Sequence, residues 1–223
     1  MYPELLQLER QVESCRAEAM RNPASACHTI TRFSSHGGHD PQLIVPEASA
    51  LSGKVDILTV GINPRWTKHD DAPCDGIPRG QVDGPKTFDK YKETILSGLP
   101  PGIVAAHVEL VQCGTPSGKD VSGVISHCRT RFFDNVILAL TPRVIIPIGK
   151  WASEQLYWYN AFSGKSGTSW EGIRRRHATI ERGTFGDHEC NLVFVLQPSS
   201  YVSMDRRDAA REAVAKAYCR EHE

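Results

Sequence analysis

VDILTVGINPRW, residues 55–66, is the stretch that decides the fold. Residues Val55–Ile62 form a short apolar and β-branched run, which is typical of a strand buried between two layers of helices. The run ends in the polar turn Gly61-Ile62-Asn63-Pro64-Arg65. A strand that only has to turn would use Asn-Gly or Asp-Gly. The Asn between Ile62 and Pro64 therefore needs another explanation.

Three more apolar or β-branched runs follow, and helical patterns alternate with them. The expected strands are Val55–Ile62, His107–Cys113, Arg143–Gly149 and Asn191–Gln197, and the expected helices are Thr87–Leu96, Val121–Leu140, Trp151–Tyr159 and Asp205–Glu221. This alternation predicts an α/β fold: one domain over residues 1–223, with three α/β/α layers around a central, mainly parallel four-stranded sheet. The segment IRRRHATIERG, residues 173–183, looks like an added hairpin.

The charge balance limits the kinds of partner that the chain can bind. Lys plus Arg and Asp plus Glu number 26 each, so the net charge of zero argues against binding nucleic acid by bulk charge alone. Basic clusters at residues 129–131, 173–177 and 205–211 have two explanations. Each could face a phosphate backbone or could be a solvated surface.

No apolar run approaches the roughly 18 residues of a membrane span, and MYPELLQLERQ at the N-terminus has the pattern of a charged amphipathic helix. We therefore expect a cytoplasmic protein, in a bacterial-type cytosol or nucleoid, with no membrane partner. A separate expectation is that it is a monomer. The seven cysteines are an odd number in a chain without a secretory signal. This favours free thiols and metal ligands over a disulfide framework.

The carboxyl ends of the four expected strands carry polar, Gly and Pro residues, in the stretches GINPRW, CGTPSG, GKWA and QPSSY. In parallel sheets flanked by helices, ligands bind beyond the carboxyl ends of the strands. Residues from all four ends can therefore build one site.

GINPRW after the first strand and LQPSSYVSM after the last resemble the two motifs of the uracil-DNA glycosylase superfamily. Members carry Gly-x-(Asp/Asn)-Pro at the first place and (His/Asn)-Pro-Ser or a relative at the second, and the mismatch-specific branch has Gly-Ile-Asn-Pro. The segment Val111–Ala152 is similar to the iron–sulfur branches, with Cys113, Cys128, the stretch Leu140–Ile145 and the turn Gly149–Ala152 at matching places. The resemblance covers about residues 15–204.

The resemblance implies a monofunctional DNA glycosylase, a hydrolase that starts base-excision repair. Its partner would be DNA containing uracil or another deaminated base, which must leave the stack before its N-glycosidic bond is cleaved. Asn63 would position the attacking water, and Gln197 would donate a hydrogen bond to a carbonyl oxygen of the departing base. The plainer alternatives are that Asn63 is a turn residue and that Gln197 satisfies loop backbone.

Further site residues follow from the same resemblance. Phe88 would stack on the flipped base, a role for which Trp66 competes, and Tyr201 would replace the lost stacking unless it is a half-buried aromatic. The base-binding residues would be Gly61, Ile62, Arg65, Phe88 and Glu109, and the DNA-binding residues Ser199, Ser200, Tyr201, Arg174, Arg175 and Arg176.

Glu109 departs from the pattern, because the iron–sulfur branches have at this place an Asn that recognises uracil. A carboxylate can accept a hydrogen bond from uracil N3–H but would repel its O4. Glu109 is therefore protonated, or neutralised by Arg65, or the preferred base is not uracil. The remaining alternative is that Glu109 is an outward-facing strand residue.

The resemblance also implies a [4Fe–4S] cluster held by Cys15, Cys27, Cys113 and Cys128. Cys15 and Cys27 stand twelve positions apart instead of forming a close Cys-x-x-Cys. This spacing fits either an inserted loop or loss of the cluster. Zinc is less favoured, because no His pairs at tight spacing with any Cys pair.

Two other classes of function remain open. Because Asn63, Glu109 and Gln197 depart from the strongest catalytic set, the chain could be a DNA-binding protein of this fold with little catalysis. An enzyme acting on small nucleosides or phosphates ranks last, because no Gly-x-Gly-x-x-Gly or P-loop signature follows any strand.

Overall fold

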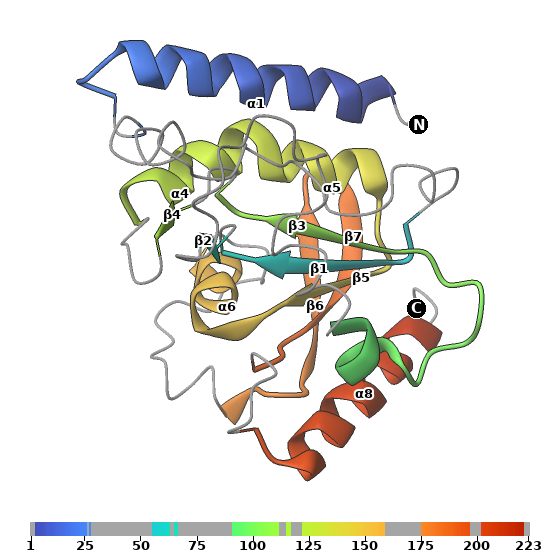
Figure 1. Ribbon diagram of the computed structural model, residues 1–223. Coiled ribbons are helices and arrows are strands. Elements are labelled where there is room, and N and C mark those ends of the chain that lie inside the picture. The colour runs from blue at the N-terminus through green and yellow to red at the C-terminus, as the bar shows by residue number, and fades with distance from the viewer. Residues whose placement is uncertain are drawn as a thin grey trace.

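The computed structural model describes residues 3–25, 27, 55–62, 65–66, 91–111, 115–116, 122–158, 175–196 and 202–220. Within them, helices flank a five-stranded sheet (Figure 1). The sheet strands are β1 (Ile57–Gly61), β3 (Ala105–Glu109), β5 (Val144–Pro147), β6 (Ile180–Phe185) and β7 (His188–Val193), in the spatial order β3-β1-β5-β7-β6. The two-residue strands β2 (Arg65–Trp66) and β4 (Thr115–Pro116) pair with each other. The helices are α1 (Pro3–Arg21), α4 (Ser122–Cys128), α5 (Asp134–Leu140), α6 (Gly149–Trp158) and α8 (Met204–Cys219), with the π-helical turns η2 (Lys92–Leu96) and η3 (Arg129–Phe133).

Strand β1 lies between two parallel neighbours, and all five of its residues are buried. Ile57 is opposite Ala105 of β3 on one side and Val144 of β5 on the other. β5 is in turn parallel to β7. A strand paired on both edges and covered on both faces must be apolar along most of its length, which is the pattern that the sequence has. The predicted α/β class and the mainly parallel sheet are confirmed.

The predicted number of four strands is wrong, because β6 adds a fifth. β6 pairs antiparallel with β7, with Ile180 opposite Val193 and Phe185 opposite His188. The chain reverses between them at Gly186, which has φ +61, a value that favours glycine. Two-residue turns join antiparallel strands directly. The second half of the segment that looked like an added hairpin therefore extends the main sheet.

Two separate hydrophobic cores lie on the two faces of the sheet. Leu58 and Val60 belong to the core on the face of α1, α4 and α5, whereas Ile57 belongs to the core shared with η2 and α8. This alternation follows from the two-residue period of a strand. Figure 1 shows α1 lying outside α4 and α5, and α8 on the other side of the sheet. Burying each such Ile, Leu or Val contributes about 1.5–3 kcal/mol.

The predicted helix over residues 121–140 is confirmed as one continuous helical stretch with a π-helical turn inside it. α4 ends at Cys128, η3 covers Arg129–Phe133, and α5 follows directly. Phe132 and Phe133 of the π turn are almost fully buried. Insertions of this kind occur often at functional sites, and this one begins directly after a predicted metal ligand.

The carboxyl end of β1 is the place where the strand order reverses. β3 lies on one side of β1, whereas the later strands β5 and β7 lie on the other side. Ligands in doubly wound sheets bind at such a switch point. Gly61 and Glu109 are opposite each other at this end of the two strands. The fold therefore brings Gly61 of the first motif next to Glu109, the residue that stands where the iron–sulfur branches have an Asn.

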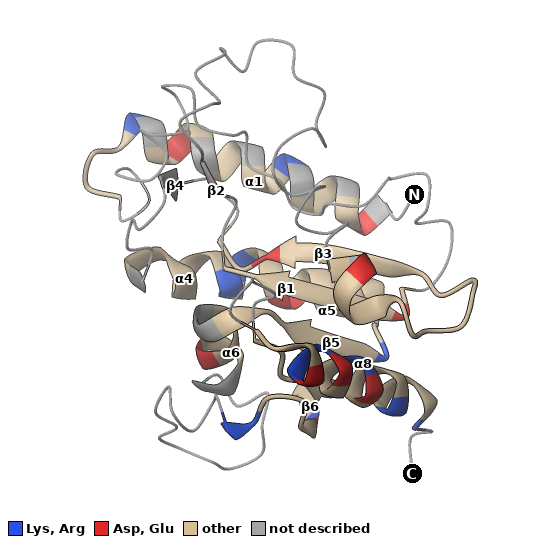
Figure 2. Ribbon diagram, turned by 60° about the horizontal axis from the view of Figure 1, so that its bottom comes forward, with Lys and Arg blue, Asp and Glu red and all other residues tan. Residues whose placement is uncertain are grey.

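Charges of both signs alternate along α8, as Figure 2 shows. Arg211 forms an ion pair with Asp208 one turn earlier on the helix. The basic cluster at residues 205–211 is therefore part of a mixed-charge surface. None of the described helices is long and apolar enough to cross a membrane.

Candidate functional site

A chain of three polar side chains links the ends of β1 and β3. His107 and Glu109 are two residues apart on β3 and so point to the same face, and Thr59 is opposite His107 in the register with β1. Thr59 Oγ1 lies 2.8 Å from His107 Nδ1, and His107 Nε2 lies 3.0 Å from Glu109 Oε1. The Thr59 hydroxyl also donates to the carbonyl oxygen of Ala106 at 3.1 Å. Thr59 and His107 are completely buried.

Glu109 lies directly over the glycine of the first motif. A Cβ atom added to Gly61 would lie 2.1 Å from Glu109 Oε2, so only glycine leaves room for the carboxyl group in this position. Only 12% of the Glu109 side chain is exposed. Glu109 is therefore an inward-facing residue, and the alternative of an outward-facing strand residue does not hold.

Tyr91 is a buried residue whose ring packs beside the His107 imidazole. Its ring centroid lies 5.8 Å from that of His107, and it belongs to the core under η2 and α8. Burial raises the pKa of the Tyr91 hydroxyl, and the negative charge of Glu109 raises it further. The environment of Glu109 is thus apolar on one side, with Tyr91 held in its neutral form.

Sequence reasoning missed Thr59, His107 and Tyr91. The stretch His107-Val108-Glu109 carries a signal that could have been used, since two polar residues at strand spacing in an apolar run must share a face. The pairing of Thr59 with His107 depends on the register between strands 48 positions apart and has no local signal.

Ile62 continues the pairing of β1 with the chain after β3. Its carbonyl oxygen accepts a hydrogen bond from Val111 N–H at 2.9 Å, and that of Gly61 accepts one from Leu110 N–H at 3.1 Å. Ile62 itself is partly buried against the core under α1. The backbone is therefore held in place up to the residue before Asn63.

Most of the remaining predicted residues lie outside the described part of the chain. For Arg65 the structure gives the backbone, paired with Thr115 in the small sheet of β2 and β4. Its expected pairing with Glu109 therefore remains a prediction. The predicted site residues that lie outside the described residues are Asn63, Phe88, Cys113, Arg174, Gln197, Ser199, Ser200 and Tyr201.

The described part of the basic segment at residues 173–177 has structural partners of its own. Arg176 forms an ion pair with Glu181 of β6, and both side chains are about three-quarters buried. Arg175 is exposed. Of these two predicted phosphate contacts, Arg175 is the one whose exposure suits the role.

His177 joins the two ends of the segment that contains Gln197. Its Nδ1 accepts a hydrogen bond from Leu196 N–H at 3.1 Å, and its Nε2 lies 2.8 Å from the carbonyl oxygen of Arg206 in the first turn of α8. An imidazole that accepts at Nδ1 and donates at Nε2 is neutral. Burial lowers the pKa of His177. The hydrogen bond to the Arg206 carbonyl oxygen offsets part of this shift, and the positive charge of Arg206 adds to it.

Two of the four predicted cluster ligands, Cys27 and Cys128, are hydrogen-bonded to each other at the end of α4, and a third, Cys15 of α1, contacts His127 of α4. A hydrogen bond between the thiols of Cys27 and Cys128 is the main reason that the pKa of Cys27 falls to about 7. Cys15 Sγ lies 3.5 Å from His127 Nε2, and burial raises the pKa of the Cys15 thiol. The donor atoms suit a soft metal centre. Among the described residues, however, no three His, Cys, Asp or Glu side chains are arranged to hold a metal ion.

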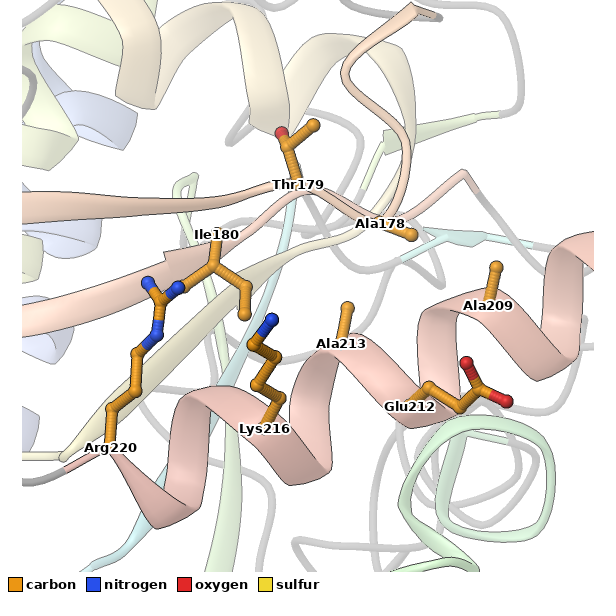
Figure 3. A pocket seen from close by; sticks show the side chains of 8 residues that line it. All are labelled: Ala178, Thr179, Ile180, Ala209, Glu212, Ala213, Lys216 and Arg220. Carbon is orange, nitrogen blue, oxygen red and sulfur yellow. The ribbon is translucent and has the colours of Figure 1, made fainter.

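A groove of about 530 Å³ lies at the other edge of the sheet, between the start of β6 and α8 (Figure 3). Small side chains such as Ala209 and Ala213 form its floor, and Glu212, Lys216 and Arg220 give it charges of both signs. β6 and β3 are opposite edges of the sheet. The groove is therefore separate from the hydrogen-bonded side chains of Thr59, His107 and Glu109.

Replacing Gly61 by Ala tests the contact with Glu109. We expect Gly61→Ala to lower the free energy of unfolding by about 1–3 kcal/mol, because the new Cβ displaces a carboxyl group that His107 holds. In a Glu109→Ala background the same change should cost nothing, because the space is then open. Urea unfolding of the four proteins measures the coupling. Additive effects would contradict the contact.

Replacing His177 tests how the segment after β7 is held. Above pH of about 6.5 His177 is neutral in both states. As the pH falls below this value, the unfolded state takes up the proton first, because the pKa of His177 is lower in the folded state. The free energy of unfolding therefore decreases until the pH has passed the folded-state pKa. We expect a smaller loss between pH 7.5 and 5.5 in His177→Gln, measured by urea unfolding. An unchanged pH dependence would show that His177 is not the responsible group.

The chain matches no protein-family model, and no curated protein resembles it at a significant level. Its function therefore has to be argued from the residues of the site and their arrangement.

Proposed function

We propose that the protein is a monofunctional DNA glycosylase that flips out uracil or another deaminated base and hydrolyses its N-glycosidic bond. The observation that supports this best is the contact between Glu109 and Gly61 at the switch point of the sheet. It gives a carboxyl group beside Gly61, the first residue of the Gly-Ile-Asn-Pro motif, at the strand end where a flipped base would be bound. Its place would be the cytoplasm or nucleoid, and it would act as a monomer.

The mechanism assigns a different task to each motif. The transition state of glycosidic cleavage is oxocarbenium-like, and negative charge spreads onto the departing base. Asn63 would hold the attacking water near C1′, and Gln197 would donate a hydrogen bond to the base. A carboxamide is not a strong base, so the reaction depends on positioning more than on proton abstraction. Phe88, Arg65 and Ile62 would line the space around the base.

DNA would be bound by the segments that flank this site. Ser199, Ser200 and Tyr201 would press into the duplex, where Tyr201 replaces the lost stacking. Arg174, Arg175 and Arg176 would contact phosphates, with Arg175 the most exposed of the described members. His177 supports this arrangement because it fixes both ends of the segment that carries Gln197.

We also propose that the fold is a three-layer arrangement of the uracil-DNA glycosylase type, with β6 as an additional edge strand. A [4Fe–4S] cluster would be bound by Cys15, Cys27, Cys113 and Cys128, and its role would be to fasten α1 to α4. The hydrogen bond between the thiols of Cys27 and Cys128 supports this proposal. When bound, the cluster would supply cross-linking of the chain and no step of base excision.

The second candidate is a protein of the same fold that binds uracil-containing or damaged DNA with little or no catalysis. It is favoured by the residue types at positions 63 and 197, since both side chains are carboxamides and neither can act as a strong base.

The glycosylase proposal is tested with oligonucleotides that contain uracil, hypoxanthine or xanthine, single-stranded and double-stranded. We expect base release, detected as alkali-labile abasic sites. Asn63→Ala should lower the rate at least about tenfold, because the water is no longer held. Binding of this DNA without release of any base would favour the second candidate.

The cluster proposal is tested by colour. We expect purified protein to be brown with broad absorbance near ~400 nm, because thiolates ligate iron. Cys128→Ala should lose this absorbance. Cys219→Ala should retain it, because Cys219 is an exposed thiol at the end of α8. A colourless, iron-free and stable wild-type protein would disprove the cluster.

A further inference from the structure

The groove between β6 and α8 lies beside the last strand of the described sheet. Among the described residues, β7 is the only strand that pairs with β6. A strand paired on one side leaves every second backbone N–H and C=O group directed to the other side. Ala178, Thr179 and Ile180 line the groove on the side of β6, and α8 lines it on the other (Figure 3). An extended peptide can add to such a strand edge as a further strand.

The side of the groove that precedes β6 is held in shape by its own hydrogen bonds. The Thr179 hydroxyl donates to the carbonyl oxygen of Arg176 at 2.6 Å, and Ala178 N–H donates to that of Phe194 at 2.8 Å. Ala178 has φ +64, a left-handed value that is uncommon for residues other than glycine and persists only where surrounding contacts enforce it. The polar side chains left to contact a ligand are therefore those of α8.

Two of these side chains are cations without an acidic partner in the described part of the chain. Lys216 and Arg220 are exposed, and the ion pairs of the described residues involve neither of them. They stand four positions apart on α8, a spacing at which like charges repel each other. Figure 3 shows both side chains extended toward Ile180, whereas Glu212 points toward the end of the groove where Ala209 lies. The end at Arg220 therefore carries positive charge that nothing in the described chain balances.

The space over the small residues of α8 is the second feature of the groove. The negative end of a helix dipole stabilises cations near a C-terminus, and this alone accounts for a basic residue at the end of α8. It does not account for the alanines at positions 209 and 213, where larger apolar side chains would bury more area against β6. The volume of about 530 Å³ that they leave is within the range of ligand-binding pockets.

The charges in the groove favour a peptide over a nucleic acid. A phosphate backbone is a continuous line of negative charge and binds to surfaces that are basic throughout. Glu212, which lines the same groove one turn before Lys216, would repel it. An extended peptide directs every second side chain to one face, so it can place a carboxylate at the basic end and an apolar side chain over the alanines.

We propose that this groove binds an extended acidic segment of a partner protein. An Asp or Glu side chain of that segment lies between Lys216 and Arg220, and a small apolar side chain packs over Ala209 and Ala213. Both cations donate charge-assisted hydrogen bonds to the same carboxylate, which offsets their mutual repulsion. Because β6 and β3 are opposite edges of the sheet, this site does not depend on the proposed glycosylase function.

The test measures how much of the purified chain is retained by immobilised random octapeptides, in sets that carry Glu, Gln or Lys at the fourth position. We expect the Glu set to retain at least about fivefold more protein than the Lys set, with the Gln set between them. Lys216→Glu should reverse this order, and Arg220→Gln should lower the preference for Glu about threefold. The matched control is Arg10→Gln, which removes an exposed cation from α1 on the other side of the sheet and should leave the preference unchanged (Figure 1).

A second variant tests the space in the groove without changing its charge. Ala209→Leu fills the groove, so retention by the Glu set should fall about threefold or more while the unfolding temperature stays close to that of the wild type. Unchanged retention in Ala209→Leu, equal retention of wild-type protein by the Glu and Lys sets, or a preference that survives Lys216→Glu would each overturn the proposal. Binding of a mixed-sequence single-stranded oligonucleotide that is lost in Lys216→Glu, with no preference among the peptides, would also overturn it and would make the groove a phosphate contact.

Discussion

The position of Glu109 over Gly61 is the constraint on which the rest of the site depends. The carboxyl group occupies the space that any other residue at position 61 would fill. It is held there by His107, which is in turn held by Thr59 of the neighbouring strand. The site is thus supported by two paired strands in the middle of the fold and not by a loop. Sites supported in this way hold their geometry more exactly than sites built on loops alone.

The sequence predicted the fold class well, because parallel strands that are covered on both faces leave apolar runs that are easy to recognise. β1, β3, β5 and β7 all lie within or overlap the expected runs. β6 was not predicted as part of the sheet, because the stretch Ile180–Phe185 has exposed residues at alternate positions and a charged start. An edge strand is covered on fewer sides, so its pattern resembles that of a surface hairpin. The π-helical turn η3 has no sequence signal, since its residues are ordinary helix formers and aromatics.

The candidate site was predicted less completely than the fold. Glu109 was found because it departs from a family pattern, whereas Thr59 and His107 were missed because strand register brings them together. The thiols of Cys27 and Cys128 show the opposite case, since residues far apart in sequence were predicted to be neighbours and are hydrogen-bonded. The residues at positions 63 and 197 lie outside the described part of the chain, so their roles stay predictions.

The hydrogen-bonded side chains of Thr59, His107 and Glu109 fill the end of the sheet at a cost in stability. Valine and leucine at these positions would bury apolar area without any need for matched donors and acceptors. Each polar atom buried here must find a partner, and the loss of one partner leaves the next unsatisfied. Stability alone therefore does not account for a buried His between a Thr and a Glu that is still 12% exposed. What these hydrogen bonds do provide is a single fixed orientation of the Glu109 carboxyl group beside Gly61, because His107 can satisfy its two buried ring nitrogens only with Thr59 on one side and Glu109 on the other.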